Sequence, residues 1–432
     1  MQKIVPELVD ASYMAVTKVG RRNIYRITVD KKLRHPLESY RSIGDMFENL
    51  SSVCKPQLSK RSQRRRIDMH RFLIQRERTP GMAMVERLTL TRPDDWHLHV
   101  RDAALMRRVV PDSARRFARA IIMPNLSPPI TNTDLARQYR NRILAAVPGG
   151  LDFQPLMTLY LTDETTPAEI ARAKASGFIH AVKWYPSGAT TNSENGVRDI
   201  VRCYPVLEAL EEQDLPLLVH AETTDPDIDV FDREAVFIDR QLTPVIQRFP
   251  GLRVVVEHVT TRNGVQFVQD ASPLIGATIT VHHLILNRNA LFDGGLRPHH
   301  YCRPVLKRES HRLALVEAAT GGDASFFLGT DSAPHPRRDK ETACGCAGIY
   351  TAHAAIELYA EVFDQADALD RLGPFASFHG ADFYGLPRNT EQITLLKKPW
   401  QVAESFDVDD DALIPLRAGE SVAWQLAELE TN

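Results

Sequence analysis

The sequence has few cysteines and no long hydrophobic run. Its 432 residues include five cysteines, an odd number too small for a disulfide framework, which favours a reducing compartment. No apolar stretch approaches the roughly 20 residues that a membrane span requires. Acidic residues also occur within the first ten positions, where a signal peptide would be apolar. We therefore expect a cytoplasmic protein without membrane contact.

A glycine-rich phosphate-binding loop is also missing. From about residue 86 onward, short apolar segments rich in β-branched residues alternate with longer amphipathic segments, which is typical of repeated βα units. A doubly wound open sheet alternates in the same way, but it usually carries a glycine-rich loop after an early strand. The pattern therefore predicts an α/β protein with a (β/α)8 TIM barrel, which typically needs about 250 residues.

Eight strand candidates follow one another in this part of the chain. The first runs from Leu88–Leu90 toward His99, and the others cover residues 119–123, 153–160, 179–184, 215–220, 252–258, 277–281 and 325–331. Helices are expected between them, for example at residues 134–147, 167–176, 201–213 and 233–247.

Residues 1–83 differ in composition from the rest. The first 81 residues contain 18 Lys or Arg against 8 Asp or Glu, a charge of +10, although the whole chain carries −2. They show no sustained helical or strand period, so we expect a poorly structured basic extension before a barrel with a C-terminal tail at residues 84–432. Upstream sequence translated in error, a targeting arm and a basic interaction tail all remain open. The arginines at 61–66 are more typical of a solvated tail than of a nucleic-acid site, so no nucleic-acid partner is expected.

Residue types that bind metals stand at the ends of five strand candidates. They are His97, His99, Lys183, His220, His258 and Asp331. The carboxyl ends of barrel strands meet at one face, so these side chains should converge. Two histidines at i and i+2 of an extended chain point the same way and can hold one metal together with a carboxylate. The sequence therefore predicts a metal site.

Lys183 needs chemical modification to take part in that site. An ammonium group cannot ligate a cation, but a lysine carbamylated by carbon dioxide becomes a carboxylate. Such a group could bridge two metals about 3.5–4 Å apart.

Three other motifs stay unassigned. Cys344-Gly345-Cys346 lacks the two-residue spacing of a zinc knuckle, so we expect a tight loop there. The pairs His282-His283 and His299-His300 could supply spare ligands, but the predicted site does not need them.

Several motifs, in order along the chain, resemble those of bacterial class II dihydroorotases. They occupy residues 92–102, 123–126, 183–193, 217–222, 257–261 and 329–335, and the likeness runs from about residue 86 to the end. The resemblance implies an amidohydrolase barrel that interconverts N-carbamoyl-L-aspartate and L-dihydroorotate in pyrimidine biosynthesis. It also implies a zinc-loaded homodimer.

The same resemblance assigns roles to the metal ligands. His97, His99 and Asp331 would bind one zinc ion. His220 and His258 would bind another. Carboxylated Lys183 and a hydroxide would bridge the two ions, and Asp331 would also transfer the proton of the bridging hydroxide to the leaving nitrogen.

The resemblance further implies a substrate pocket. Arg101, Asn125 and His335 match positions that bind substrate, and a guanidinium suits a carboxylate. Thr190 and Thr191 lie in a stretch, 188–196, that looks like a mobile loop. Two more positions, Arg303 and Ala347, match main-chain contacts to substrate, although an apolar residue would be expected in place of Arg303.

The sequence argues against two alternative functions. A hydantoinase or allantoinase relative would share the metals but not the anchor formed by Arg101, Asn125 and His335, so this set argues against it. A metal-free barrel acting as a scaffold would have lost ligands, whereas none is missing here.

Overall fold

The computed structural model describes residues 14–19, 22–27, 86–343 and 345–427. The chain divides into two compact units, Met1–Met82 and Ala83–Asn432. The described part of the first unit is an antiparallel pair of strands, β1 (Met14–Val19) and β2 (Arg22–Ile27). The sequence did not predict this pair, because lysine, arginine and asparagine interrupt the apolar residues of both runs. The arginines at 61–66 lie outside the described residues.

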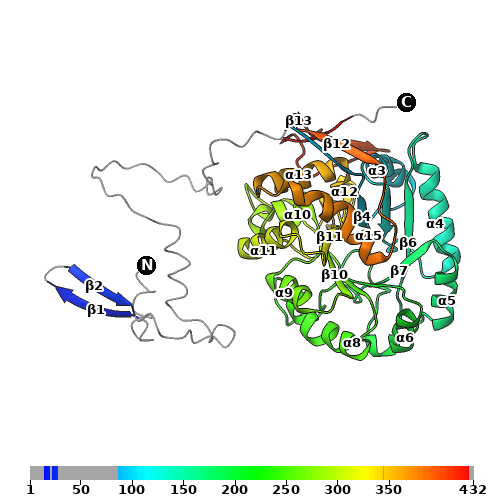
Figure 1. Ribbon diagram of the computed structural model, residues 1–432, viewed down its shortest axis with the longest axis horizontal. Helices are drawn as coiled ribbons and strands as arrows, with labels where there is room; N and C mark the ends of the chain where they lie inside the picture. The colour runs from blue at the N-terminus through cyan, green and yellow to red at the C-terminus, as the bar shows by residue number, and fades with distance from the viewer. Residues whose placement is uncertain (1–13, 20–21, 28–85, 344, 428–432) are drawn as a thin grey trace. The chain divides into compact units, whose positions relative to one another are not determined.

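Eight parallel strands form the barrel of the second unit, and their order in the sheet follows their order in the chain (Figure 1). The strands are β4 (Asp94–Leu98), β5 (Arg119–Ile122), β6 (Gln154–Tyr160), β7 (Ile179–Trp184), β8 (Leu217–Val219), β9 (Val254–Val256), β10 (Ile275–Ile279) and β11 (Phe326–Leu328). The predicted (β/α)8 fold is confirmed.

Hydrogen bonds at residues predicted to bind metal join the first and last strands of the barrel. Just beyond β11, the Asp331 N–H donates to the His97 carbonyl at 2.9 Å, and the His99 N–H donates to the Ser332 carbonyl at 3.1 Å. The contacts between the first and eighth strands are therefore made at the mouth of the predicted site.

Helices follow the strands and cover the outside of the barrel (Figure 1). They are α3 (Ala103–Arg116), α4 (Thr133–Ala146), α5 (Pro167–Ala175), α6 (Tyr204–Glu212), α7 (Arg233–Phe237), α8 (Thr243–Arg248), α9 (Arg262–Asp270), α10 (Val281–Ile285), α11 (Glu309–Thr320), α12 (Arg337–Lys340), α13 (Ala355–Gln365), α14 (Leu369–Gly373) and α15 (His379–Tyr384). A π turn at Ile238–Leu242 interrupts the helix predicted at 233–247. Pro244 follows this turn and lacks the N–H that a continuous α-helix would use at this position.

One strand assignment was wrong. Leu88–Leu90 lies in β3 (Arg87–Thr91), which pairs antiparallel with β12 (Gln392–Leu396). The latter also pairs with β17 (Gln425–Leu426), so these three strands form a sheet separate from the barrel. Pro93 separates β3 from β4 and cannot donate to a ladder, which explains why the chain turns there. Two small antiparallel pairs complete the C-terminal part: β13 (Trp400–Gln401) with β16 (Ser421–Val422), and β14 (Phe406–Val408) with β15 (Asp411–Leu413).

A layer of inward side chains forms the floor of the barrel. Seven strands contribute buried residues to it, namely Trp96, Ile121, Leu156, Ala181, Leu218, Val255 and Phe327. On β10, a Cβ at Gly276 would lie 2.9 Å from a ring carbon of Phe327, so only glycine fits there without a shift. Since strand side chains alternate, the residues two positions further along, such as Lys183 and His220, lie in the layer above this floor.

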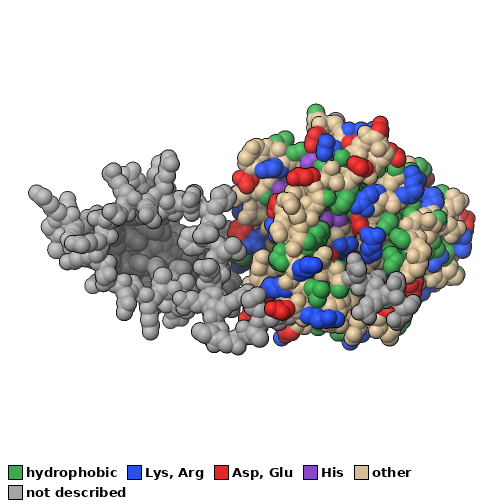
Figure 2. All heavy atoms as spheres, turned by 90° about the horizontal axis from the view of Figure 1, so that it is seen from above, with side chains coloured by type: hydrophobic (Ala, Val, Ile, Leu, Met, Phe, Trp, Pro, Cys, Tyr) green, Lys and Arg blue, Asp and Glu red, His purple; other side chains and the backbone are tan. Residues whose placement is uncertain are grey.

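Acidic and basic side chains are interspersed over the face of the barrel unit seen in Figure 2. Within the described ranges, no helix has the length and apolar character that crossing a membrane would require.

Candidate metal centre and substrate pocket

The predicted site residues converge on one small cavity of about 20 Å³ at the carboxyl ends of the strands. Its lining includes most of the predicted set: His97, His99, Arg101, Asn125, Thr190, Thr191, His220, His258, Arg303, Asp331 and Ala347. Three lining residues were not predicted, namely Tyr185, Ala333 and Gly348. Lys183 and His335 do not line the cavity but contact its walls, as described below.

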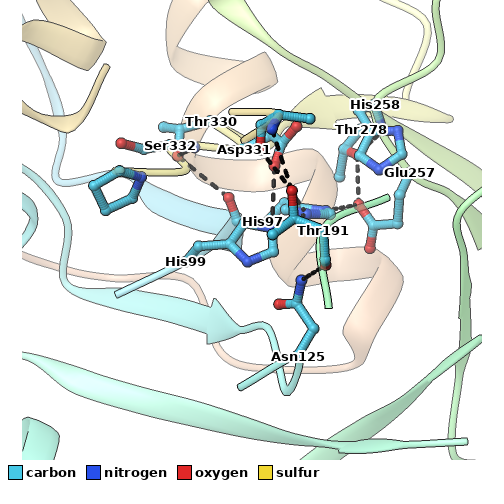
Figure 3. A network of polar contacts seen from close by, with 12 residues as sticks. His97, His99, Asn125, Thr191, Glu257, His258, Thr278, Thr330, Asp331 and Ser332 are labelled. Carbon is cyan, nitrogen blue, oxygen red and sulfur yellow. Dashed lines mark hydrogen bonds and ion pairs between the residues drawn. The ribbon is translucent and has the colours of Figure 1, made fainter. Parts of the chain in front are cut away.

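His97, His99 and Asp331 form one side of the centre (Figure 3). The Nε2 atoms of the two histidines lie 3.3 Å apart, and both are within 3.4 Å of Asp331 Oδ1. Burial lowers the pKa of His99 to about 3, and the nearby Arg101 acts in the same direction. The imidazole of His99 is therefore neutral at pH 7, which is the form that binds metals.

His220 and His258 lie next to this group, and ligand atoms of His97, His258 and Asp331 lie within 4.8 Å of one another. The ring centroids of His220 and His258 lie 4.8 Å apart, and the ring of His258 is 5.0 Å from that of His97. Burial lowers the pKa of both histidines, so both are neutral. The Nδ1 atom of His258 is buried without a hydrogen-bond partner among the described residues.

Lys183 is fully buried in the same layer as His220. Its Nζ lies 5.2 Å from the ring centroid of Tyr185 and has no hydrogen-bond partner in the described part of the chain. Burial lowers its pKa to about 8. An unpaired buried ammonium is costly, and its ready loss of a proton would expose the amine that attacks carbon dioxide. The orphaned lysine and histidine nitrogens therefore fit a metal centre with a carboxylated lysine.

Two buried carboxylates that the sequence reasoning missed hold the histidines in place. Glu257 Oε2 lies 2.7 Å from His97 Nδ1 and accepts a hydrogen bond of 2.5 Å from the Thr278 hydroxyl (Figure 3). Glu222 Oε2 lies 3.1 Å from His220 Nε2. Each carboxylate selects one tautomer and leaves the other ring nitrogen free for a metal. Strand alternation could have found Glu257, because it lies two residues beyond the floor residue Val255.

The backbone at two predicted ligands is strained. His258 and Asp331 have φ angles of 42° and 41°. Such conformations cost about 1–3 kcal/mol each for residues other than glycine, and they cluster at functional sites. They explain how residues just past a strand end can turn back toward the centre.

The predicted substrate residues form a connected wall. Arg101 Nη2 lies 2.9 Å from His335 Nε2, which is 3.1 Å from the Ala347 carbonyl. The Ala347 N–H donates to the Thr191 hydroxyl at 3.2 Å, and Asn125 donates to the Thr191 carbonyl at 3.1 Å. The loop at 188–196 thus touches both sides of the pocket.

Arg303 also lines the cavity, and its side chain is half-buried. Its Nε donates to the Tyr301 hydroxyl at 3.0 Å. The tyrosine accounts for how an arginine is accommodated where the resemblance implies an apolar residue.

The two histidine pairs that the sequence left unassigned do not line this cavity. His282, His283 and Cys302 form a buried cluster with atoms suited to metals. Both ring nitrogens of His283 have partners, since Nδ1 lies 2.7 Å from the Thr280 hydroxyl and Nε2 lies 3.1 Å from the Pro304 carbonyl. His283 and Cys302 are therefore hydrogen-bonded, whereas both ring nitrogens of His282 are buried without a hydrogen-bond partner among the described residues. His299 and His300 contact Glu341 and the Ala290 carbonyl, and Cys344 lies outside the described residues.

A barrel with these residues at its mouth is typical of a class of metal-dependent hydrolases. Comparison with known proteins identifies the family within this class. The model of the amidohydrolase family matches residues 89–409, so the chain belongs to the amidohydrolase family. Membership of this family implies metal dependence. Within it, the chain groups with dihydroorotases: a dihydroorotase of Nitrosomonas europaea is 67% identical over 344 residues, which cover 79% of this chain and 99% of that protein.

Two solved structures of dihydroorotases are also similar to this chain. The dihydroorotase of Saccharomyces cerevisiae in complex with 5-fluoroorotic acid has a TM-score of 0.73 at 34% identity, over 79% of this chain and 99% of that one. A dihydroorotase from Campylobacter jejuni has a TM-score of 0.73 at 36% identity, over 80% and 99% of the two chains.

Proposed function

We propose that this chain catalyses the reversible cyclisation of N-carbamoyl-L-aspartate to L-dihydroorotate with loss of water, the third step of de novo pyrimidine biosynthesis. Relatives of high identity named dihydroorotase support this function. The observation that carries the mechanism is the buried Nζ of Lys183, which has no hydrogen-bond partner among the described residues and interacts electrostatically with His97, His220, His258 and Asp331.

We infer that the metals are two zinc ions. His97, His99 and Asp331 would hold one ion, His220 and His258 the other, and carboxylated Lys183 with a hydroxide would bridge them. When bound, the ions would acidify a water molecule and polarise the reacting carbonyl. The pairing of His97 with Glu257 and of His220 with Glu222 supports this arrangement, because it orients both imidazoles.

Asp331 is the proposed acid and base. In ring opening, its carboxylate accepts a proton from the attacking water and delivers it to the amide nitrogen as the carbon–nitrogen bond breaks. In ring closure, it takes the proton from the carbamoyl nitrogen and returns it to the departing oxygen. A single carboxylate can serve both directions because the proton travels between the same two atoms.

The substrate carboxylate is bound away from this centre. Arg101 offers a fork of N–H donors, and Asn125 and His335 stand beside it on the wall. We infer that the main chain at Arg303 and Ala347 contacts the substrate. A cavity of about 20 Å³ holds roughly one water molecule, so the loop with Thr190 and Thr191 must move to admit substrate and then close over it.

A homodimer and a cytoplasmic location remain predictions from the resemblance and from the low cysteine content. We also propose that residues 1–83 are not part of the functional barrel.

A kinetic assay tests the proposed function. The purified protein should interconvert L-dihydroorotate and N-carbamoyl-L-aspartate, lose activity on chelation and regain it with zinc. It should not hydrolyse hydantoin or allantoin efficiently, because these rings lack the carboxylate that Arg101 would bind. Preference for either uncharged ring would overturn the assignment.

A further inference from the structure

Lys340, the last residue of α12, is a buried lysine without a carboxylate partner. Its side chain is 3% exposed, and no ion pair to it exists among the described residues. Its Nζ instead donates to three main-chain carbonyls: Tyr301 at 2.8 Å, Cys346 at 3.0 Å and Gly348 at 2.6 Å. All three ammonium protons are therefore used.

The three carbonyls belong to the two segments that build the pocket wall. Cys346 and Gly348 flank Ala347, and Tyr301 lies two residues before Arg303. The Gly348 N–H also donates to the Tyr301 carbonyl at 3.0 Å, so the two segments are joined directly beside the ammonium group. Lys340 thus ties together the segments that carry both residues proposed to contact substrate by main chain.

The main chain at Gly348 is tightly packed. Its φ angle is 153°, and a Cβ there would lie 2.4 Å from the Ala333 carbonyl. Gly348 therefore has a backbone conformation that residues with a side chain rarely adopt. In this conformation its carbonyl accepts the hydrogen bond from Lys340. Small displacements of this segment would move Ala347 relative to Arg101 and His335.

We propose that Lys340 is a positioning residue for substrate recognition, which holds the main chain at Arg303 and Ala347 in the geometry that binds the substrate. This inference rests on the proposed function. The uncompensated charge has a second consequence, because it adds positive potential beside the anion pocket. In keeping with this, the pKa of His335 is lowered first by burial, then by Arg101 and then by Lys340.

The role differs from that of Asp331 or the metal ligands, because Lys340 does not line the cavity. Its loss should therefore raise KM and leave kcat and metal content nearly unchanged. A role in the chemical step would lower kcat instead, and a general loss of structure would reduce metal content and thermal stability together.

The test compares Lys340→Met and Lys340→Arg with wild type, and it uses Lys397→Met as a matched control. Lys397 is also partly buried, but it pairs with Asp364 and does not line the pocket. We expect Lys340→Met to raise KM in both directions by about tenfold or more, with kcat within about threefold of wild type. Two metals per chain should be retained. Lys340→Arg, which keeps the charge and several donors, should recover most of the loss, and Lys397→Met should leave KM unchanged.

An unchanged KM in Lys340→Met, or the same change in Lys397→Met, would overturn the proposal while leaving the proposed function intact. If Lys340→Met did not fold, Lys340→Gln would decide, because it keeps two donors without the charge and should also raise KM. Wild-type protein inactive on L-dihydroorotate would overturn the proposed function and the role of Lys340 with it.

Discussion

Replacing Lys183 with methionine should stabilise the metal-free protein while it abolishes activity. The side chain is fully buried, and its Nζ has no hydrogen-bond partner among the described residues. Burial lowers the pKa from the ordinary 10.5 to about 8, a difference that corresponds to about 3 kcal/mol against the charged form in the folded state. Methionine is similar in length and carries no charge, so it should recover much of that free energy.

The stability gained by Lys183→Met should decrease as the pH rises. Below pH 8 the lysine is protonated in both the folded and the unfolded chain, so the full penalty applies and the variant gains most. As the pH rises from about 8 toward 10.5, the folded state loses its proton first, and the gain should shrink to nothing. Urea denaturation of both proteins, free of metal and carbon dioxide, measures this difference. Equal or lower stability of Lys183→Met at pH 7, or a gain independent of pH, would show that the buried lysine does not destabilise the metal-free protein in this way.

Three further predictions concern the roles of other residues. Arg101→Met should lower kcat/KM by about a thousandfold, since an unpaired buried charge costs several kcal/mol, and metal analysis should still find two ions; loss of metal would assign Arg101 a different role. Asp331→Asn should lose turnover in variants that circular dichroism shows to be folded, and substantial remaining activity would exclude Asp331 as the proton carrier. A protein that starts at Met84 should keep wild-type kcat/KM and melting temperature, because a basic segment without a sustained period is not expected to bury apolar area and so adds no stability to the barrel; a drop of several degrees would show that residues 1–83 contribute to it.

The barrel could be predicted because its strands have clear signals. Runs such as Val254–Val256 are continuous and apolar, as expected for parallel strands buried on both faces. Leu88–Leu90 has a similar composition but joins another sheet, since the partner strand β12 is some 300 residues away and nothing local identifies it. The π turn at Ile238–Leu242 was missed for a related reason, because it depends on packing that a helical period does not encode.

The site was predictable where side chains lie directly at strand ends. Lys183 and His220 lie two residues beyond the floor residues Ala181 and Leu218, as strand alternation predicts. His97 directly follows the floor residue Trp96, because the register of β4 is irregular between Asp95 and Leu98. His258 and Asp331 reach the same cavity only through left-handed backbone conformations, which the sequence does not reveal. The supporting carboxylates were missed for a different reason. Alternation places Glu257 on the inward face of its strand, but its contacts with His97 and Thr278 join residues of other strands, which the local sequence does not show.

Carboxylated Lys183 is proposed to join two metals in the site. Reconstitution of the metal-free protein with zinc tests this role most directly, with dihydroorotate hydrolysis measured at increasing zinc in buffers with and without bicarbonate. We expect activity to appear only when bicarbonate is present and to reach its maximum at two zinc ions per chain. Carbon-13 bicarbonate should also give a bound carbamate signal that Lys183→Met lacks. Full activity in the absence of carbon dioxide, or at one zinc ion per chain, would exclude the bridging role of Lys183.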